Sequence, residues 1–149
     1  MDDQRRQSWR VSIMADSISR SQRSRVMAAV RSHGNKRTEI RLAKLLRSAA
    51  IKGWRRQQPV FGKPDFAFAK LRVAVFVDGC FWHGCRKCYR RPASSRKYWD
   101  AKVSRNKSRD QLVNRELRKL GWRVFRIWEC ALAKRPLSCL KRIEKALHV

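Results

Sequence analysis

The chain has 149 residues, 43% of them hydrophobic, which suits one domain with a buried core and excludes a disordered tail. Lysine and arginine number 38 against 11 acidic residues, giving a formal net charge of +27. A folded chain with this charge repels itself, so the composition favours a polyanionic partner, nucleic acid above all, over a basic surface kept only for solubility.

No apolar run approaches the roughly 20 residues needed to span a bilayer. The first residues carry arginines but lack the apolar stretch of a signal peptide. We therefore expect a cytoplasmic, nucleoid-associated protein without a membrane segment. In a reducing compartment, clustered cysteines indicate a metal site before they indicate disulfides.

The N-terminal half is predicted to begin with a flexible leader, residues 1–18, followed by a single domain over 19–149. Met14 is an alternative start. A short helix is predicted over 23–32, with Ser19 or Ser21 as its cap, and "SHGNK" ends it. From Thr38 a second helix is predicted, because apolar residues recur at helical spacing and basic residues lie between them.

Strands dominate the middle of the predicted fold. Phe66 and Phe68 alternate as in a strand after the turn "GKPD", and 72–77, "RVAVFV", has the composition of a buried strand. These two strands lie close enough along the chain to form a hairpin.

The C-terminal third is predicted to be helix, strand, helix. A long helix over 95–119 ends at Gly121, a strand follows in "WRVFRIWE", and "LSCLKRIEKAL" closes the chain. The residues expected to anchor the long helix in the core are Trp99, Val103, Leu112, Val113 and Leu117. This order of elements predicts an α/β domain whose central mixed sheet is flanked by helices.

Four of the five cysteines have the spacing of a metal site. Cys80, Cys85 and Cys88 fall within nine residues, and Cys130 follows the last predicted strand, where the chain can return to the same end of the sheet. Four thiolates complete a tetrahedral zinc site that pins a loop. His83 is an alternative ligand, and small buried apolar cysteines are the alternative to a site. Cys139 is expected in the core.

A separate group of residues has the chemistry of a hydrolytic site. Asp65 starts one strand of the predicted hairpin, and Val77 and Asp78 end the other, so the hairpin brings them to the same level. A carboxylate there with a second acid or a backbone carbonyl holds Mg²⁺, which activates phosphodiesters. His83, predicted on a loop, is poised to take a proton from water, and Glu39 is a partner that orients it. The alternative is a turn acid and a structural histidine.

Four stretches in this order, "GKPDF", "FVDGCFWHGC", "KYWDAKVSRNKSRD" and "LGWRVFRIWEC", closely resemble the very-short-patch-repair (Vsr) mismatch endonucleases. The resemblance covers about residues 19–131. It implies a restriction-endonuclease-like fold with structural zinc. It also implies Mg²⁺-dependent nicking of double-stranded DNA on the 5′ side of thymine in T:G mismatches, which arise from deaminated 5-methylcytosine.

The resemblance also implies a role for particular residues. The metal-binding aspartate falls on Asp65, the main-chain metal contact on Val77, the active-site histidine on His83 and the supporting glutamate on Glu39. The zinc ligands fall on Cys80, Cys85, Cys88 and Cys130. The aromatic wedge inserted beside the mismatch falls on Phe81 and Trp82, with Trp99 as a further intercalating candidate. Core packing is the alternative for these rings.

Two departures from the family pattern affect the site. The best-known member has a histidine where this chain has Asp78, which leaves open whether Asp78 binds metal or replaces a contact to phosphate. It also has a histidine as zinc ligand where this chain has Cys85, and both residue types bind zinc.

The expected partner is double-stranded DNA with a T:G mismatch, and one active site is enough to nick one strand, so we expect a monomer. A MutL-like protein and a repair polymerase follow only from the family. Two other functions fit the residues: a restriction-type nuclease that cuts paired DNA, and a zinc-stabilised DNA-binding module without activity.

Overall fold

A computed structural model describes residues 38–148 of the chain. The predicted leader, the alternative start at Met14, the predicted helix over 23–32 and the domain boundary at 18/19 lie outside these residues. The elements follow one another as α3 (Glu39–Ser48), β1 (Phe66–Phe68), the 3₁₀ turn η1 (Ala69–Leu71), β2 (Val73–Asp78), α4 (Cys80–His83), α5 (Arg96–Lys119), β3 (Arg123–Trp128), α6 (Glu129–Lys134) and α7 (Pro136–Leu147).

The described strands form one mixed sheet in the order β1-β2-β3. The predicted hairpin is confirmed: β1 and β2 are antiparallel with Phe66 opposite Val75, and η1 joins them. β2 and β3 run parallel, with Val73 opposite Arg123 and Asp78 opposite Trp128. The carboxyl ends of β2 and β3 therefore lie at the same edge of the sheet, where loops collect functional residues.

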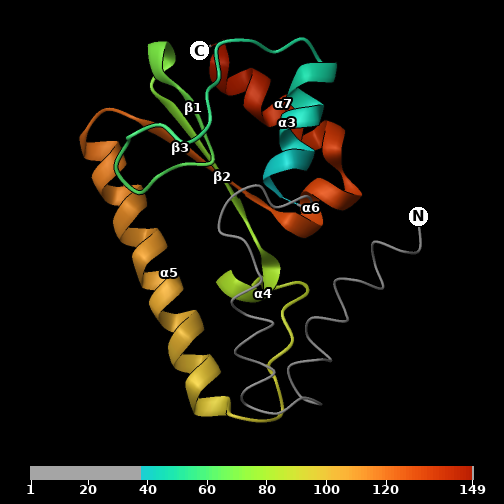
Figure 1. The fold of residues 1–149 in the computed structure, drawn as a ribbon, viewed down its shortest axis with the longest axis vertical. Helices are drawn as coiled ribbons and strands as arrows, with labels where there is room; N and C mark the ends of the chain where they lie inside the picture. The colour runs from blue at the N-terminus through green and yellow to red at the C-terminus, as the bar shows by residue number, and fades with distance from the viewer. Residues whose placement is uncertain (1–37, 149) are drawn as a thin grey trace.

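Helices cover both faces of the sheet (Figure 1). α5 lies alone on one face, where Val113 and Leu117 pack against Ala74 and Phe76 of β2. α3, α6 and α7 cover the opposite face, where the larger core gathers. Alternate residues of β2 serve the two cores, as the period of two in a strand requires. Because both faces are covered, all six residues of β2 are buried.

The long predicted helix is confirmed as α5, with one exception among its anchors. Trp99, Val103, Val113 and Leu117 are buried, but Leu112 is 42% exposed because it lies one residue off the inward stripe. Gly121 follows the end of the helix with φ +83, and Trp122 donates a backbone hydrogen bond to Leu117 there.

Two short helices stand where the sequence predicts none. α4 turns Cys80–His83, expected to be loop, into one helical turn. Gly84 ends it with φ +63, and a Cβ at that position would lie 2.6 Å from Val103 Cγ1 of α5. Glycine is therefore required both for the left-handed backbone and for the close approach of α4 to α5. α6 holds Cys130 in its first turn.

The fold class is thus mixed α/β, with a small three-stranded mixed sheet in the part of the chain that the structure describes. None of the helices in residues 38–148 is long and apolar enough to cross a membrane.

Candidate active site

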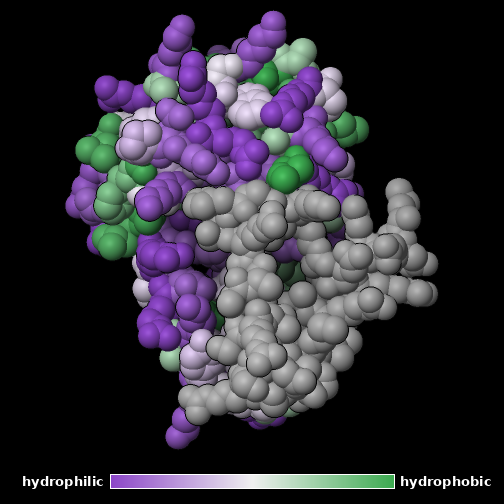
Figure 2. All heavy atoms as spheres, viewed as in Figure 1, coloured by the Kyte–Doolittle hydropathy of each residue, from purple (hydrophilic) through white to green (hydrophobic). Residues whose placement is uncertain are grey.

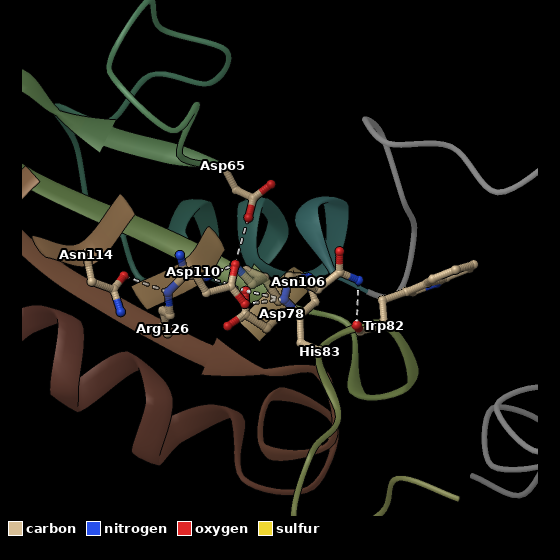
Figure 3. Close-up of polar contacts among 9 residues, drawn as sticks. Asp65, Asp78, Trp82, His83, Asn106, Asp110, Asn114 and Arg126 are labelled. Atoms are coloured by element: carbon tan, nitrogen blue, oxygen red, sulfur yellow. Dashed lines mark hydrogen bonds and ion pairs between the residues drawn. The ribbon is translucent and has the colours of Figure 1, made fainter. Parts of the chain in front are cut away.

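The candidate site lies at the carboxyl end of β2, where α4 begins (Figure 3). Asp78 is the last residue of β2, and His83 is the last residue of α4. Asn106 of α5 donates a hydrogen bond from Nδ2 to the Trp82 carbonyl at 2.7 Å, which fixes α4 against the long helix. The short helix is thereby held on two sides, by the end of the sheet and by α5.

His83 forms a close pair with an aspartate from α5. The distance between His83 Nδ1 and Asp110 Oδ2 is 2.5 Å, and the two side chains are only 19% and 16% exposed. The sequence predicts that Glu39 orients His83. In the structure, the carboxylate that contacts His83 Nδ1 belongs to Asp110. A carboxylate on Nδ1 fixes the tautomer and leaves Nε2 as the nitrogen that can accept a proton.

Asp78 and Arg126 extend this pair into a network. Arg126 Nη1 lies 2.8 Å from Asp78 Oδ1 and 3.3 Å from Asp110 Oδ1. Asp78 Oδ1 is also 3.9 Å from His83 Nδ1. Burial raises the pKa of the Asp78 carboxyl, and the positive charge of Arg126 is the strongest influence in the opposite direction.

Asp65 approaches β2 as the hairpin predicts. The backbone N–H of Val77 donates a hydrogen bond to Asp65 Oδ2 at 2.7 Å, so the predicted proximity of these residues is confirmed. In Figure 3 Asp65 lies above the group of Asp78, His83 and Asp110, on the turn that leads into β1. The Asp65 carboxylate therefore lies next to the end of β2 but is separate from the group formed by Asp78, His83 and Asp110.

A cavity of about 310 Å³ lies beside Asp65. Its lining residues come from the start of α3 and from the segment before β1: Glu39, Gln57, Gln58, Pro59, Lys63, Pro64 and Asp65. Glu39 is 2% exposed and accepts hydrogen bonds from Arg56 at 2.8 Å and 2.6 Å. Glu39 thus shares a cavity with Asp65, two acids that the sequence places in the same site.

The four cysteines predicted as zinc ligands meet in one cluster. Their sulfur atoms all lie within 4.8 Å of one another, with Cys80, Cys85 and Cys88 from the segment around α4 and Cys130 from α6. Sulfur ligands about 2.3 Å from a tetrahedral zinc ion stand roughly 3.8 Å apart. The distance between Cys85 Sγ and Cys130 Sγ is 3.8 Å, so the donor set fits such an ion.

The protonation of the thiols differs within the cluster. Burial raises the pKa of Cys88 to about 12 and also raises that of Cys80. Burial is also the largest single influence on Cys85, but backbone hydrogen bonds from Lys87 and Cys88 and contacts with the Cys88 and Cys130 thiols together outweigh it, so that its pKa is lowered. A metal ion, which requires thiolates, would bind with release of protons. Cys139, on α7, is buried in the hydrophobic core, as predicted.

The predicted wedge residues lie in a cluster of aromatic rings. Phe81 and Trp82 are partly buried, and their ring centroids are 5.3 Å apart. Trp99 packs at 5.2 Å from Phe81 and is only 1% exposed. Trp99 therefore does not present a ring for intercalation in this structure. The Trp82 side chain points away from the His83–Asp110 pair (Figure 3).

The long helix that carries Asp110 is basic. α5 carries nine lysines and arginines against three acids. In the view of Figure 2 most of the described surface is hydrophilic. Such a surface suits a phosphate backbone.

Asp110, Arg126 and Asn114 are site residues that the sequence reasoning misses. A signal for Asp110 does exist: it is the only acid between Lys102 and Arg115, and it falls on the inward face of α5 with Val103, Val113 and Leu117. A carboxylate on a helix stripe that is otherwise buried needs a partner inside the protein. The sequence does not say which partner.

The chain is similar to known DNA nicking enzymes. Residues 15–90 match the family model of the DNA mismatch endonuclease Vsr. The chain is 37% identical over 136 residues to the type II nicking enzyme V.NmeDIP of Neisseria meningitidis serogroup C, covering 89% of this chain and 90% of that relative.

Two further relatives extend the comparison. The chain is 42% identical to the type II nicking enzyme V.NaeI of Lentzea aerocolonigenes, over 72% of this chain and 67% of the relative. It is 36% identical to the DNA mismatch endonuclease Vsr of Escherichia coli, over 82% of this chain and 78% of the relative. The chain belongs to the Vsr family of DNA mismatch endonucleases and is a DNA nicking endonuclease.

Proposed function

We propose that this endonuclease nicks double-stranded DNA on the 5′ side of the thymine in T:G mismatches, as a step in the repair of deaminated 5-methylcytosine. The observation that carries the proposal is the set of side chains that α4 brings together. One helical turn holds two aromatic residues, Phe81 and Trp82, directly before His83, whose ring pairs with Asp110. A base-stacking element and a proton acceptor in one rigid turn couple recognition of a disturbed base pair to cleavage beside it.

His83 acts as the general base in this proposal. Because Nδ1 faces Asp110 at 2.5 Å, Nε2 is the nitrogen that takes the proton from the attacking water. Asp110 holds the ring in the required tautomer and stabilises the imidazolium that forms. The negative charge that develops on the phosphoryl oxygens and on the leaving oxygen must be stabilised by other groups.

Asp65 is the residue we assign to magnesium. Carboxylate and carbonyl oxygens are the ligands that Mg²⁺ prefers. Asp65 accepts a hydrogen bond from the backbone N–H of Val77, and we assign the main-chain carbonyl of that residue as the second protein ligand. When bound, the ion supplies electrostatic stabilisation of the charge that develops on the phosphodiester. Glu39 supports Asp65 from across the cavity that the two acids share.

Zinc is the ion we assign to Cys80, Cys85, Cys88 and Cys130. A closed site of four thiolates is structural, because it has no open position for substrate. It connects the start of α4 and the segment after it to α6. The ion therefore holds the wedge residues and His83 in register with the sheet.

The wedge in this proposal consists of Phe81 and Trp82. Inserting a ring between base pairs unstacks one step at a cost of roughly a few kcal/mol, and a mismatched step resists least. Trp99, buried beneath Phe81, supports the wedge. The cost of unstacking then supplies part of the preference for a mismatch.

A labelled duplex with one T:G pair tests the proposal. In the presence of Mg²⁺ the wild-type protein nicks it, and Asp65→Asn loses the activity because it removes the charged oxygen that holds the ion. Equal nicking by the two proteins would remove Asp65 from the active site.

A second candidate function is nicking of matched DNA at a defined sequence, because the names of the type II nicking relatives specify nicking without naming a mismatch. A duplex with T:A in place of T:G, in the same flanking sequence, separates the two. Faster nicking of the T:A duplex than of the T:G duplex would favour this second function.

A further inference from the structure

An arginine lies inside the network of catalytic side chains. Arg126 extends from β3 with a side chain that is 18% exposed, and its Nη1 reaches Asp78 at 2.8 Å and Asp110 at 3.3 Å. These carboxylates and His83 offer ligand atoms within 4.8 Å of one another. Two acids this close repel each other when ionised, so they need a cation between them.

The position of the guanidinium is fixed from three sides. Its Nε donates a hydrogen bond to Asn114 Oδ1 at 2.7 Å. Its Cζ lies 4.3 Å from the centre of the Phe76 ring, within the range of a cation–π contact. Asn114 is one helical turn after Asp110, so Arg126 binds the same face of α5 at two successive turns. The Asp110 carboxylate is thereby tied to β3 on one side while it meets His83 on the other (Figure 3).

We propose that Arg126 is a positioning residue for nicking: it holds Asp110 against His83, and Asp78 is its counterion rather than a metal ligand. This inference rests on the proposed role of His83. It also assigns a role to Asp78, which the sequence leaves open between metal binding and phosphate contact.

The competing interpretation is a cation site made by Asp78, His83 and Asp110. Arg126 argues against it, because a divalent ion sharing these carboxylates would lie beside a guanidinium that already contacts both. Like charges in a partly buried site repel strongly. The cation of this group is therefore the arginine, and the magnesium assigned above belongs at Asp65.

Single-turnover nicking of the T:G duplex tests the role of Arg126. Arg126→Met keeps the length of the side chain but removes its charge and donors. The expected loss in rate is about 10- to 100-fold, the usual effect of removing a residue that orients a catalytic group. DNA affinity and the Mg²⁺ concentration for half-maximal rate are expected to stay unchanged, and Arg126→Lys to recover part of the rate.

Two comparisons make the test specific. Arg123→Met removes the same side chain from the other end of β3, opposite Val73, and is expected to nick at the wild-type rate. The double variant Asp78→Asn with Arg126→Met is expected to be no slower than Arg126→Met alone, because residues that act as a unit are not additive. A multiplied loss in the double variant would contradict the pairing.

A wild-type rate in folded Arg126→Met would overturn the proposal, as would a raised Mg²⁺ requirement in Asp78→Asn. If Arg126→Met lacks a cooperative melting transition, Asn114→Ala replaces it. This variant releases Nε without removing a charge, and an unchanged nicking rate would then overturn the proposal. If the wild type nicks only matched DNA, the proposed substrate is wrong, and the same variants are compared on that DNA.

Discussion

His83 and Asp110 are the two residues on whose contact the proposed chemistry of the site depends. The pair is held from both sides, since Asn106 of α5 binds the backbone of α4 and Arg126 of β3 binds Asp110. A general base must keep a fixed tautomer as well as a fixed position. In this protein a carboxylate on Nδ1 provides both, with only a small part of either side chain exposed.

At the scale of single residues, Asp110→Asn is expected to slow nicking by about 10²- to 10⁴-fold, the usual contribution of a positioned general base. An amide keeps the shape but does not stabilise the imidazolium. Single-turnover rates at saturating enzyme measure the effect. The matched control is Asp100→Asn on the same helix, where a half-exposed acid pairs with Arg91.

That control is expected to retain the wild-type rate, because an exposed ion pair contributes little. If Asp110→Asn and Asp100→Asn nick at the same rate, His83 does not depend on Asp110, and the base must be assigned elsewhere.

The residues of this site differ in how far the sequence reveals them. Asp65 and Val77 were predictable because a hairpin with a short turn fixes which residues lie opposite each other. The contacts of His83 with Asp110 and of Asp78 with Arg126 join residues 27 and 48 positions apart. They depend on how α5 and β3 dock on the sheet, which the periodicity of one segment does not specify.

At the scale of elements, α4 is the unit that brings recognition and chemistry together in the proposed function. It has four residues, too few to be stable as an isolated helix. Its stability must come from its neighbours: Gly84 allows close contact with Val103 of α5, and Cys80 and Cys85 bind it to the cysteine cluster. We infer that a loss of the cluster would release α4 before it affects the sheet.

Cys130→Ser tests the cluster at this scale, with Cys139→Ser as its control. The first variant removes the ligand that comes from α6, and we expect it to lose zinc, a large part of its thermal stability and its nicking activity. Zinc content per chain and the melting temperature measure the change. Chelation of the wild-type protein is expected to give the same result.

Cys139 is also a buried thiol, but it lies on α7 in the hydrophobic core and is not part of the cysteine cluster. Cys139→Ser is therefore expected to lower the melting temperature while keeping one zinc ion per chain. Zinc retained in Cys130→Ser at the wild-type stoichiometry would contradict the four-thiolate site.

The secondary structure was largely predictable at this scale, and the exceptions have physical causes. α3, α5 and the hairpin have strong periodicity or apolar runs, which the structure confirms. α4 was expected to be a loop, because four residues between glycines give too little periodicity to recognise. The exposure of Leu112 shows that an apolar residue within a helix need not face the core.

At the scale of the whole molecule, charge and fold have separate functions. A net charge of +27 gives affinity for any duplex through the phosphate backbone, without distinguishing sequences or mismatches. In the proposed function, discrimination comes from α4, where the aromatic pair and His83, the proposed base, lie. The basic composition predicted a nucleic-acid partner from the sequence alone, and membership in a family of DNA nicking endonucleases agrees with it.

The most direct test of this account is to map the nicks in a T:G duplex labelled on each strand in turn, with Mg²⁺ present. One active site beside one wedge predicts a single nick, in the thymine strand only and immediately 5′ of the mismatched thymine. Cleavage of both strands, or nicks whose positions do not move with the mismatch, would contradict the account.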